Sequence, residues 1–115
     1  MDCIFCKIAE GQIPSQKVYE DDQVVAFRDI QPQAPVHLLV IPRKHIPSLN
    51  EASAEDAQLL GHALLTASRV AKEAGLAERG YRVLTNIGKD AGQTVFHLHL
   101  HVLGGEMLGG LNVKS

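Results

Sequence analysis

The sequence lacks most features that would place it in a specialised class of protein. It has no tryptophan, only two cysteines, and aromatic residues at 4% of its 115 positions. Its 11 Lys and Arg against 13 Asp and Glu give a formal charge of −2. Nucleic-acid-binding domains are more often basic, with their cations on one face. This near balance of charge argues against a nucleic-acid partner.

Long hydrophobic runs are also missing. No apolar stretch approaches the roughly eighteen residues of a membrane-spanning helix, and the N-terminus MDCIFCKIAEG lacks the basic and apolar regions of a signal peptide. We therefore expect a cytoplasmic protein with no membrane partner. With 45% hydrophobic residues, the chain is expected to form one domain over residues 1–115. Its glycine-rich tail, from about residue 106 to 115, is expected to be irregular.

Hydrophobic periodicity predicts one long helix among several strands. An apolar stripe at helical spacing begins after a capping box formed by Ser53 and Asp56, and Gly75 is the natural stop. Strands are expected over residues 18–19, 24–29, 36–41, 81–86 and 95–103. This order favours an α+β domain with a mainly antiparallel five-stranded sheet and a short N-terminal helix.

Half of the six histidines lie in the segment FHLHLHVLGG, where His97, His99 and His101 alternate with apolar residues. On a strand, alternate side chains share one face at a spacing of roughly 6.5 to 7 Å. The three imidazoles would therefore face one way, too far apart to bond to one another. Such a row fits an exposed polar face, a catalytic metal site, or a histidine that attacks phosphorus. The spacing alone does not choose among them.

The residues around the histidines narrow this choice. The stretches VVAFRDIQPQAPVHLLVIPRKHI and GYRVLTNIGKDAGQTVFHLHLHVLGG resemble the Hint branch of the histidine triad (HIT) superfamily, the purine nucleoside phosphoramidases. The uridylyltransferase branch has Gln at the third triad position, where this chain has His101. The resemblance implies a HIT-like fold paired in a homodimer. It also implies hydrolysis of the P–N bond of purine nucleoside 5′-phosphoramidates through a covalent nucleotidyl-histidine intermediate.

The same resemblance assigns roles to individual histidines. His99 is expected to be the nucleophile, with its second nitrogen held by a backbone carbonyl in the glycine-rich segment after the strand. His101 is expected to contact the phosphate and, in its charged form, to offset negative charge on the oxygens. His37 resembles a further catalytic histidine, although a core position suits it nearly as well. Thr94 is expected to supply a catalytic hydroxyl near the phosphate and leaving group.

The resemblance also predicts the residues that bind the nucleotide. Asp29 matches a ribose contact, since an ionised carboxylate accepts from both the 2′- and the 3′-hydroxyl. Phe27 and Ile30 match the walls of the base pocket, although each taken singly also fits a plain core position. The phosphate side would be formed by Asn86, Gly92, Gln93 and Thr94 together with His99 and His101.

The two cysteines form a Cys-x-x-Cys pair. In a reducing compartment this spacing suits a shared metal or a redox pair better than a structural disulfide. Some bacterial members of the family bind zinc through such a pair and two histidines, which here would be Cys3, Cys6, His45 and His97. Two thiolates and two imidazoles close a tetrahedral site, so the zinc would be structural and no catalytic metal would be required. The alternative is a pair of reduced thiols.

Two other functions stay open at this level. The same chemistry could hydrolyse dinucleoside polyphosphates, and the chain could also be a non-enzymatic, nucleotide-binding regulatory protein. In all three cases the expected ligand is a purine nucleoside monophosphate or a derivative of one.

Overall fold

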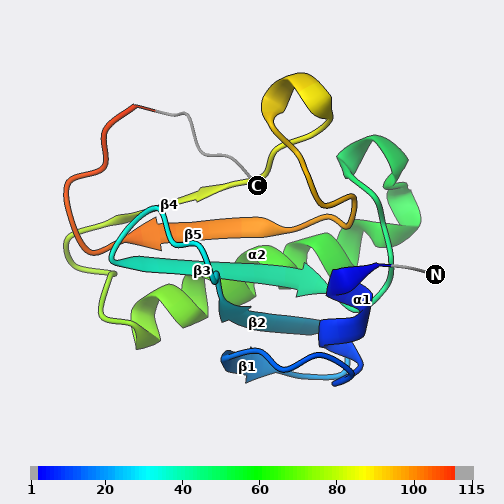
Figure 1. The fold of residues 1–115 in the computed structure, drawn as a ribbon, viewed down its shortest axis with the longest axis horizontal. Coiled ribbons are helices and arrows are strands. Elements are labelled where there is room, and N and C mark those ends of the chain that lie inside the picture. Colours follow the sequence, from blue (N-terminus) through cyan, green and yellow to red (C-terminus); the bar gives the residue numbers. More distant parts are fainter. Residues whose placement is uncertain (1–2, 111–115) are drawn as a thin grey trace.

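The computed structural model describes residues 3–110 and has the α+β architecture that the sequence predicts (Figure 1). Its five strands form one sheet in the order β1-β2-β3-β5-β4, and every neighbouring pair is antiparallel. The strands are β1 (Lys17–Glu20), β2 (Val24–Arg28), β3 (Val36–Pro42), β4 (Tyr81–Leu84) and β5 (Leu100–Gly104). The helices are α1 (Ile4–Ala9) and α2 (Ala57–Glu73), with single 3-10 turns at Leu49–Glu51, Ala54–Asp56 and Lys89–Ala91.

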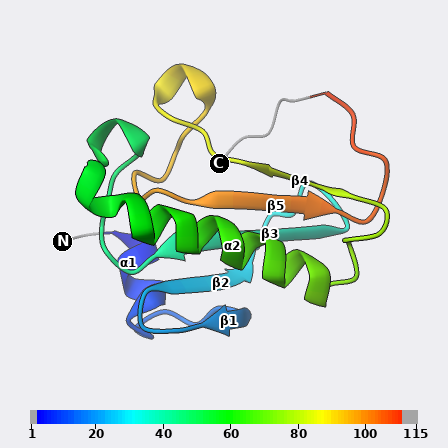
Figure 2. The ribbon, with the colours of Figure 1, turned by 180° about the vertical axis from the view of Figure 1, so that it is seen from behind.

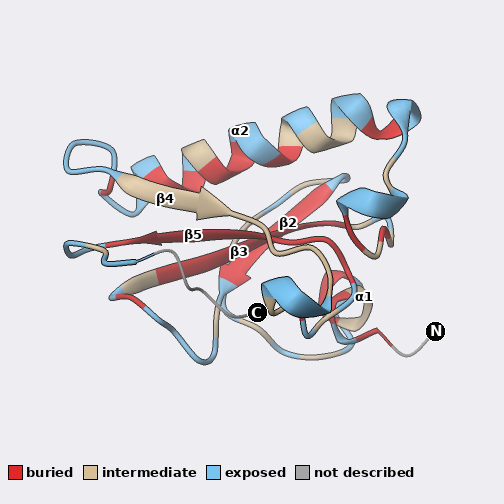
Figure 3. Cartoon of the chain, turned by 90° about the horizontal axis from the view of Figure 1, so that it is seen from above, coloured by how far each residue is buried: buried red, intermediate tan, exposed pale blue. Residues whose placement is uncertain are grey.

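The sheet is covered on both faces, by α2 on one and by α1 on the other (Figures 1 and 2). Side chains alternate between the faces, so Ala26 and Val40 pack under α2 while Val25 and Leu39 pack under α1. Strands that are buried on both sides need continuous apolar sequence, which explains the runs VVAF and LLVI. The central strands are accordingly buried along their length (Figure 3).

Helix α2 begins and ends as its sequence predicts. The amide of Ser53 donates to Asp56 Oδ2 over 3.0 Å at the predicted capping box, and the α-helix follows directly. At the other end Gly75 adopts a φ of 81°, a left-handed conformation that only glycine takes without strain. The amide of the next residue, Leu76, then bonds back to the Ala71 carbonyl. The chain therefore turns sharply toward β4.

The predicted fifth strand was wrong at its start. It was expected over 95–103 but begins at Leu100, so His97 and His99 precede it. The backbone there has other partners: the Leu98 amide donates to the Ile46 carbonyl over 2.6 Å. The facing residue Pro42 has no N–H to offer to a ladder. The pairing of β3 with β5 consequently ends at Leu100.

The remaining differences lie at element ends. The predicted strand over 81–86 stops at Leu84, the one over 24–29 stops at Arg28, and the one over 36–41 extends to Pro42. Residues 106–110 of the predicted irregular tail contain no helix or strand, and residues 111–115 lie outside the described part of the chain. Within the described residues, no helix is long and apolar enough to cross a membrane.

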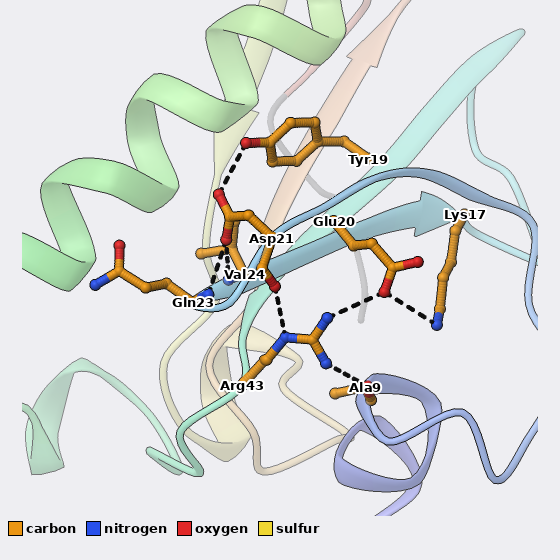
Figure 4. Close-up of polar contacts among 8 residues, drawn as sticks. All are labelled: Ala9, Lys17, Tyr19, Glu20, Asp21, Gln23, Val24 and Arg43. Carbon is orange, nitrogen blue, oxygen red and sulfur yellow. Dashed lines mark hydrogen bonds and ion pairs between the residues drawn. The ribbon is translucent and has the colours of Figure 1, made fainter.

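The turn between β1 and β2 is held by the carboxylate of Asp21 (Figure 4). Its Oδ1 accepts from the amides of Gln23 and Val24, each at 2.8 Å, and its Oδ2 accepts from the Tyr19 hydroxyl at 2.8 Å. His62 Nε2, on α2, lies 2.7 Å from the same Oδ2. Burial alone would raise the pKa of Asp21, but these donors together lower it well below its usual range.

We predict that Asp21→Ala lowers the free energy of unfolding at pH 7 by about 1 to 3 kcal/mol, because the amide and hydroxyl donors of the turn lose a charged acceptor. A carboxyl group with a depressed pKa stabilises the fold above its unfolded pKa of about 3.9, and this contribution is lost as the pH falls. Urea unfolding should therefore show a difference between wild type and variant that shrinks below about pH 4. Asp22→Ala, at the exposed neighbouring position, is the control; a difference that stays constant down to pH 3 would contradict the assignment.

Candidate active site

A pocket of about 350 Å³ opens between α1, the end of β2 and the histidine segment. Its apolar lining includes Phe27 and Leu39, and its polar lining includes Asp29, His99 and His101. Mostly apolar walls with a few convergent polar groups are typical of small-molecule sites, and the volume suits a ligand of modest size. The pocket is the candidate active site.

His37 and His101 form a hydrogen-bonded pair at the edge of this pocket. The strand register places His37 and Leu39 of β3 on the same face as His101 of β5, so the two rings approach each other across the pairing. His37 Nδ1 accepts from the Gln33 amide at 2.9 Å, which leaves the proton of a neutral His37 on Nε2. That nitrogen lies 2.8 Å from His101 Nδ1. His101 therefore accepts at Nδ1 and carries its own proton on Nε2.

The prediction that these rings do not bond to one another holds for Nδ1 of His101. Its partner is His37 on the adjacent strand, which lies outside the row of three histidines. The His99 and His101 rings are also close, with 5.0 Å between their centroids. The chain before Leu100 does not follow the strand path, which brings the rings nearer than strand spacing would.

His99 is held in one tautomer by the backbone. Its Nδ1 donates to the carbonyl oxygen of His97 over 2.7 Å, so in the neutral ring Nε2 keeps the lone pair. A backbone carbonyl was predicted for this role, but in the segment after the strand; the acceptor in fact comes two residues earlier. Because the His97 carbonyl lies outside the β3–β5 pairing, it is available to this side chain. His99, which lines the pocket, thus keeps an unprotonated Nε2 in its neutral form.

Burial keeps these histidines neutral. Desolvation lowers the pKa of His99 and of His37, and the nearby Asp29 carboxylate only partly opposes it. Burial, followed by the proximity of His99 and His37, lowers the pKa of His101 to about 3. His101 is therefore neutral in the free protein at pH 7, and its charged form beside a bound phosphate stays a prediction. Its Nε2–H remains a hydrogen-bond donor without carrying a full charge.

The cysteine pair meets the first histidine of the row at a second polar cluster. The donor atoms of Cys3, Cys6, His45 and His97 all lie within 4.8 Å of one another. Sγ of Cys3 is 3.3 Å from His97 Nδ1, and Sγ of Cys6 is 3.3 Å from His45 Nδ1. The two imidazole Nδ1 atoms are 3.2 Å apart. These four side chains could hold a metal ion.

The protonation of this cluster fits a soft cation such as zinc. His97 Nε2 donates to the Pro42 carbonyl over 2.7 Å, which leaves its Nδ1 lone pair directed at the sulfurs. Burial, with help from Cys3, raises the pKa of Cys6 to about 11, so its thiol is neutral at pH 7 without a nearby positive charge. A bound divalent cation would supply that charge and hold the thiolates, as zinc does with Cys and His ligands.

The predicted nucleotide contacts are brought together only in part. Phe27, Asp29, Ile30 and Thr94 line the pocket. Within the described residues, Asn86, Gly92 and Gln93 are not among its lining. The Gly92 and Gln93 amides bond to carbonyls of their own loop, and the Gln93 side chain bridges Gly88 to Pro47 and Val95. Gln93 therefore braces the loop that carries Thr94.

Sequence reasoning missed the contribution of α1. Phe5 lies between the two cysteines, and its ring packs edge-on against His99, with 5.0 Å between centroids, and against Phe27 at 5.6 Å. Ile4 and Ile8 of α1 also line the pocket. The signal was available, because a cysteine pair that reaches His97 must bring the residue between the cysteines next to the histidine segment.

Comparisons with known proteins agree with this geometry. The HIT domain model matches residues 10–108. The purine nucleoside phosphoramidase of Escherichia coli K12 is 50% identical over 108 residues, which are 94% of this chain and 91% of that protein. An uncharacterized HIT-like protein of Synechococcus elongatus is 56% identical over 107 residues, or 93% of each chain.

Solved structures give the same result. A HIT family hydrolase from Legionella pneumophila superposes with a TM-score of 0.94 at 47% identity, covering 97% of this chain and 100% of that one. A histidine triad protein from Clostridium difficile has a TM-score of 0.93 at 50% identity, covering 96% of each chain. The chain belongs to the HIT domain family. Within that family it is a hydrolase.

Proposed function

We propose that this hydrolase cleaves the P–N bond of purine nucleoside 5′-phosphoramidates, with His99 as the nucleophile. The observation that carries the proposal is the fixed tautomer of His99, whose Nδ1–H is bound to the His97 carbonyl while the ring lines the pocket. A neutral imidazole with a directed lone pair is a competent nucleophile near pH 7. The name of the E. coli relative supports the substrate class.

The pocket suits a nucleoside whose phosphate points toward His99. Phe5 and Phe27 offer aromatic surface to a base, and the exposed Ile30, with 92% of its surface accessible, offers an apolar edge that a bound base would cover. Asp29 would accept from the ribose hydroxyls. The α-phosphate would then lie toward His99 and His101, with the Thr94 hydroxyl and the His101 N–H as donors to its oxygens.

The reaction divides into two displacements. In the first, His99 Nε2 forms a bond to phosphorus, the P–N bond breaks, and the amine leaves with that electron pair and takes up a proton. In the second, water attacks the nucleotidyl-histidine, the bond to His99 breaks, and a proton is returned to solvent. One water is consumed overall, and the same donors stabilise both transition states. His101, which is neutral in the free protein, would donate a directed hydrogen bond from its Nε2–H to a phosphate oxygen.

We predict that His99→Ala abolishes release of AMP from adenosine 5′-phosphoramidate, lowering kcat by about 10⁴-fold or more, because no other group replaces the nucleophile. His62→Gln changes a histidine on α2 outside the pocket and is expected to keep wild-type kcat. Rapid quenching followed by mass spectrometry should detect AMP attached to His99 in the wild type.

The outcome separates the candidate activities. Faster turnover of diadenosine polyphosphates than of the phosphoramidate would assign the site to dinucleoside polyphosphate hydrolysis. AMP binding without turnover of either substrate would leave a nucleotide-binding regulatory protein. An active His99→Ala variant would refute the covalent mechanism for every substrate.

We further propose that Cys3, Cys6, His45 and His97 hold a structural zinc ion. The donor chemistry supports this, since two thiols and two imidazoles complete a tetrahedral shell and leave no position for a reacting water. His97 would then orient the histidine segment and take no part in the chemistry. Bound zinc would supply the positive charge that keeps the cysteines deprotonated.

We predict one zinc per chain by native mass spectrometry, lost in His45→Ala but retained in His62→Ala, which removes a histidine elsewhere. Loss of the zinc should remove about 3 kcal/mol of stabilisation by bound metal and so lower Tm by roughly 10 °C or more. The metal-free His45→Ala protein should still release AMP below its Tm, because the ion is outside the reaction. Equal zinc content in the two variants would contradict the assignment.

We also propose a homodimer. Two surfaces support it: β4 lies at the edge of the sheet, and Leu64 and Leu65 of α2 are 55% and 72% exposed. We predict that sedimentation equilibrium gives twice the 12.5 kDa of one chain, and that Leu64→Glu shifts it toward the monomer because it buries a charge in the interface. Ser68→Glu, one turn further along α2, tests how far the interface extends. A wild-type chain that stays at 12.5 kDa at micromolar concentration would refute the dimer.

A further inference from the structure

Ser15 is a polar residue of the pocket lining that the mechanism above does not use. Ser15 lies just before β1 and lines the pocket together with Asp29. The Arg28 amide donates to the Gln16 carbonyl over 3.0 Å, so the two segments run side by side beyond the end of the β1–β2 pairing. This antiparallel continuation places Ser15 next to Asp29.

The Ser15 oxygen is shielded from solvent and has no hydrogen-bond partner among residues 3–110. Buried polar atoms in native proteins nearly always have a partner, so an orphaned hydroxyl in a binding pocket needs an explanation. Ser15 also borders a second hollow of about 520 Å³, which shares Asp29 and Ile30 with the pocket. Ser15 therefore lies where the two hollows meet, at the Asp29 end of the candidate site.

The bonding capacity of Asp29 indicates which partner would fit. Its Oδ1 accepts from the Gln31 amide at 2.8 Å, and its Oδ2 is 3.4 Å from His37 Nε2. An ionised carboxylate can only accept, so a ribose hydroxyl bound there must donate its proton to Asp29. The lone pairs of that ribose oxygen then need a donor. A serine hydroxyl, which can donate, is the group that completes this arrangement.

We propose that Ser15 donates a hydrogen bond to a ribose hydroxyl held by Asp29 and so selects ribonucleotides over deoxyribonucleotides. This inference rests on the proposed function, because it takes Asp29 as the ribose contact. Asp29 and Ser15 together give that hydroxyl both an acceptor and a donor. A sugar without the hydroxyl leaves Asp29 short of a donor and Ser15 unpaired, and sites built to bond a substrate hydroxyl reject analogues that lack it.

The test compares three substrates, the 5′-phosphoramidates of adenosine, 2′-deoxyadenosine and 3′-deoxyadenosine, in wild type and Ser15→Ala. The variant should lower kcat/KM for the adenosine compound by about three- to tenfold, the usual effect of one lost hydrogen bond. It should have less than about a twofold effect on the deoxy compound that lacks the contacted hydroxyl. Ser15→Thr, which keeps a hydroxyl, should recover most of the loss. Ser68→Ala, a serine on α2 outside both hollows, is the matched control.

The possible failures can be told apart. An equal loss on all three sugars would overturn the proposal, because the serine would then act on another part of the substrate or on the fold. Wild-type kinetics in Ser15→Ala would overturn it as well, since the oxygen would then be paired with water. In both cases the wild type still releases AMP, and the proposed function stands. A wild type that neither binds AMP in calorimetry nor releases it would refute the proposed function and this inference together.

Discussion

The carbonyl oxygen of His97 is the acceptor on which the arrangement of the site depends. It can accept from the His99 ring because the segment before Leu100 is not paired in the sheet. In that segment the Leu98 amide donates to the Ile46 carbonyl, and the facing Pro42 has no N–H to donate. Had the ladder continued to residue 95, a neighbouring strand would compete for this carbonyl. The ring of His99 would then lose the bond that assigns its tautomer. An irregular segment at the end of the strand thus leaves the His97 carbonyl available to the His99 side chain.

The segment from His97 to His101 supplies histidines to two different sites. His97 turns toward the cysteines and is oriented by the Pro42 carbonyl, whereas His99 and His101 turn toward the pocket. His101 is oriented in turn by His37, whose own tautomer is set by the Gln33 amide. His97 and His99 therefore each have one nitrogen bound to a backbone carbonyl and the other directed at a candidate ligand site, whereas both nitrogens of His37 have protein partners. In each case the neighbour bound to one ring nitrogen fixes the tautomer and so decides which nitrogen can meet a ligand.

Several features of the fold and of the candidate site could be predicted from the sequence. The stop of α2 before Gly75 and the capping box of Ser53 and Asp56 ahead of its start at Ala57 depend on local chemistry, which can be read along the sequence. The grouping of Cys3 and Cys6 with two distant histidines followed from the family resemblance, since spacing gives only the pair. The role of Phe5 was missed because it arises from packing across the sheet. The neutrality of His101 was missed because burial among other imidazoles is a property of the folded environment.

The ring of Phe5 is shared by the two sites. It packs on His97 in the cysteine cluster, with 6.0 Å between centroids, and on His99 and Phe27 in the pocket. Helix α1, only six residues long, carries this ring together with one of the cysteines. An amino-terminal fusion or truncation that displaced this helix would remove a pocket wall and the sulfur donors at once.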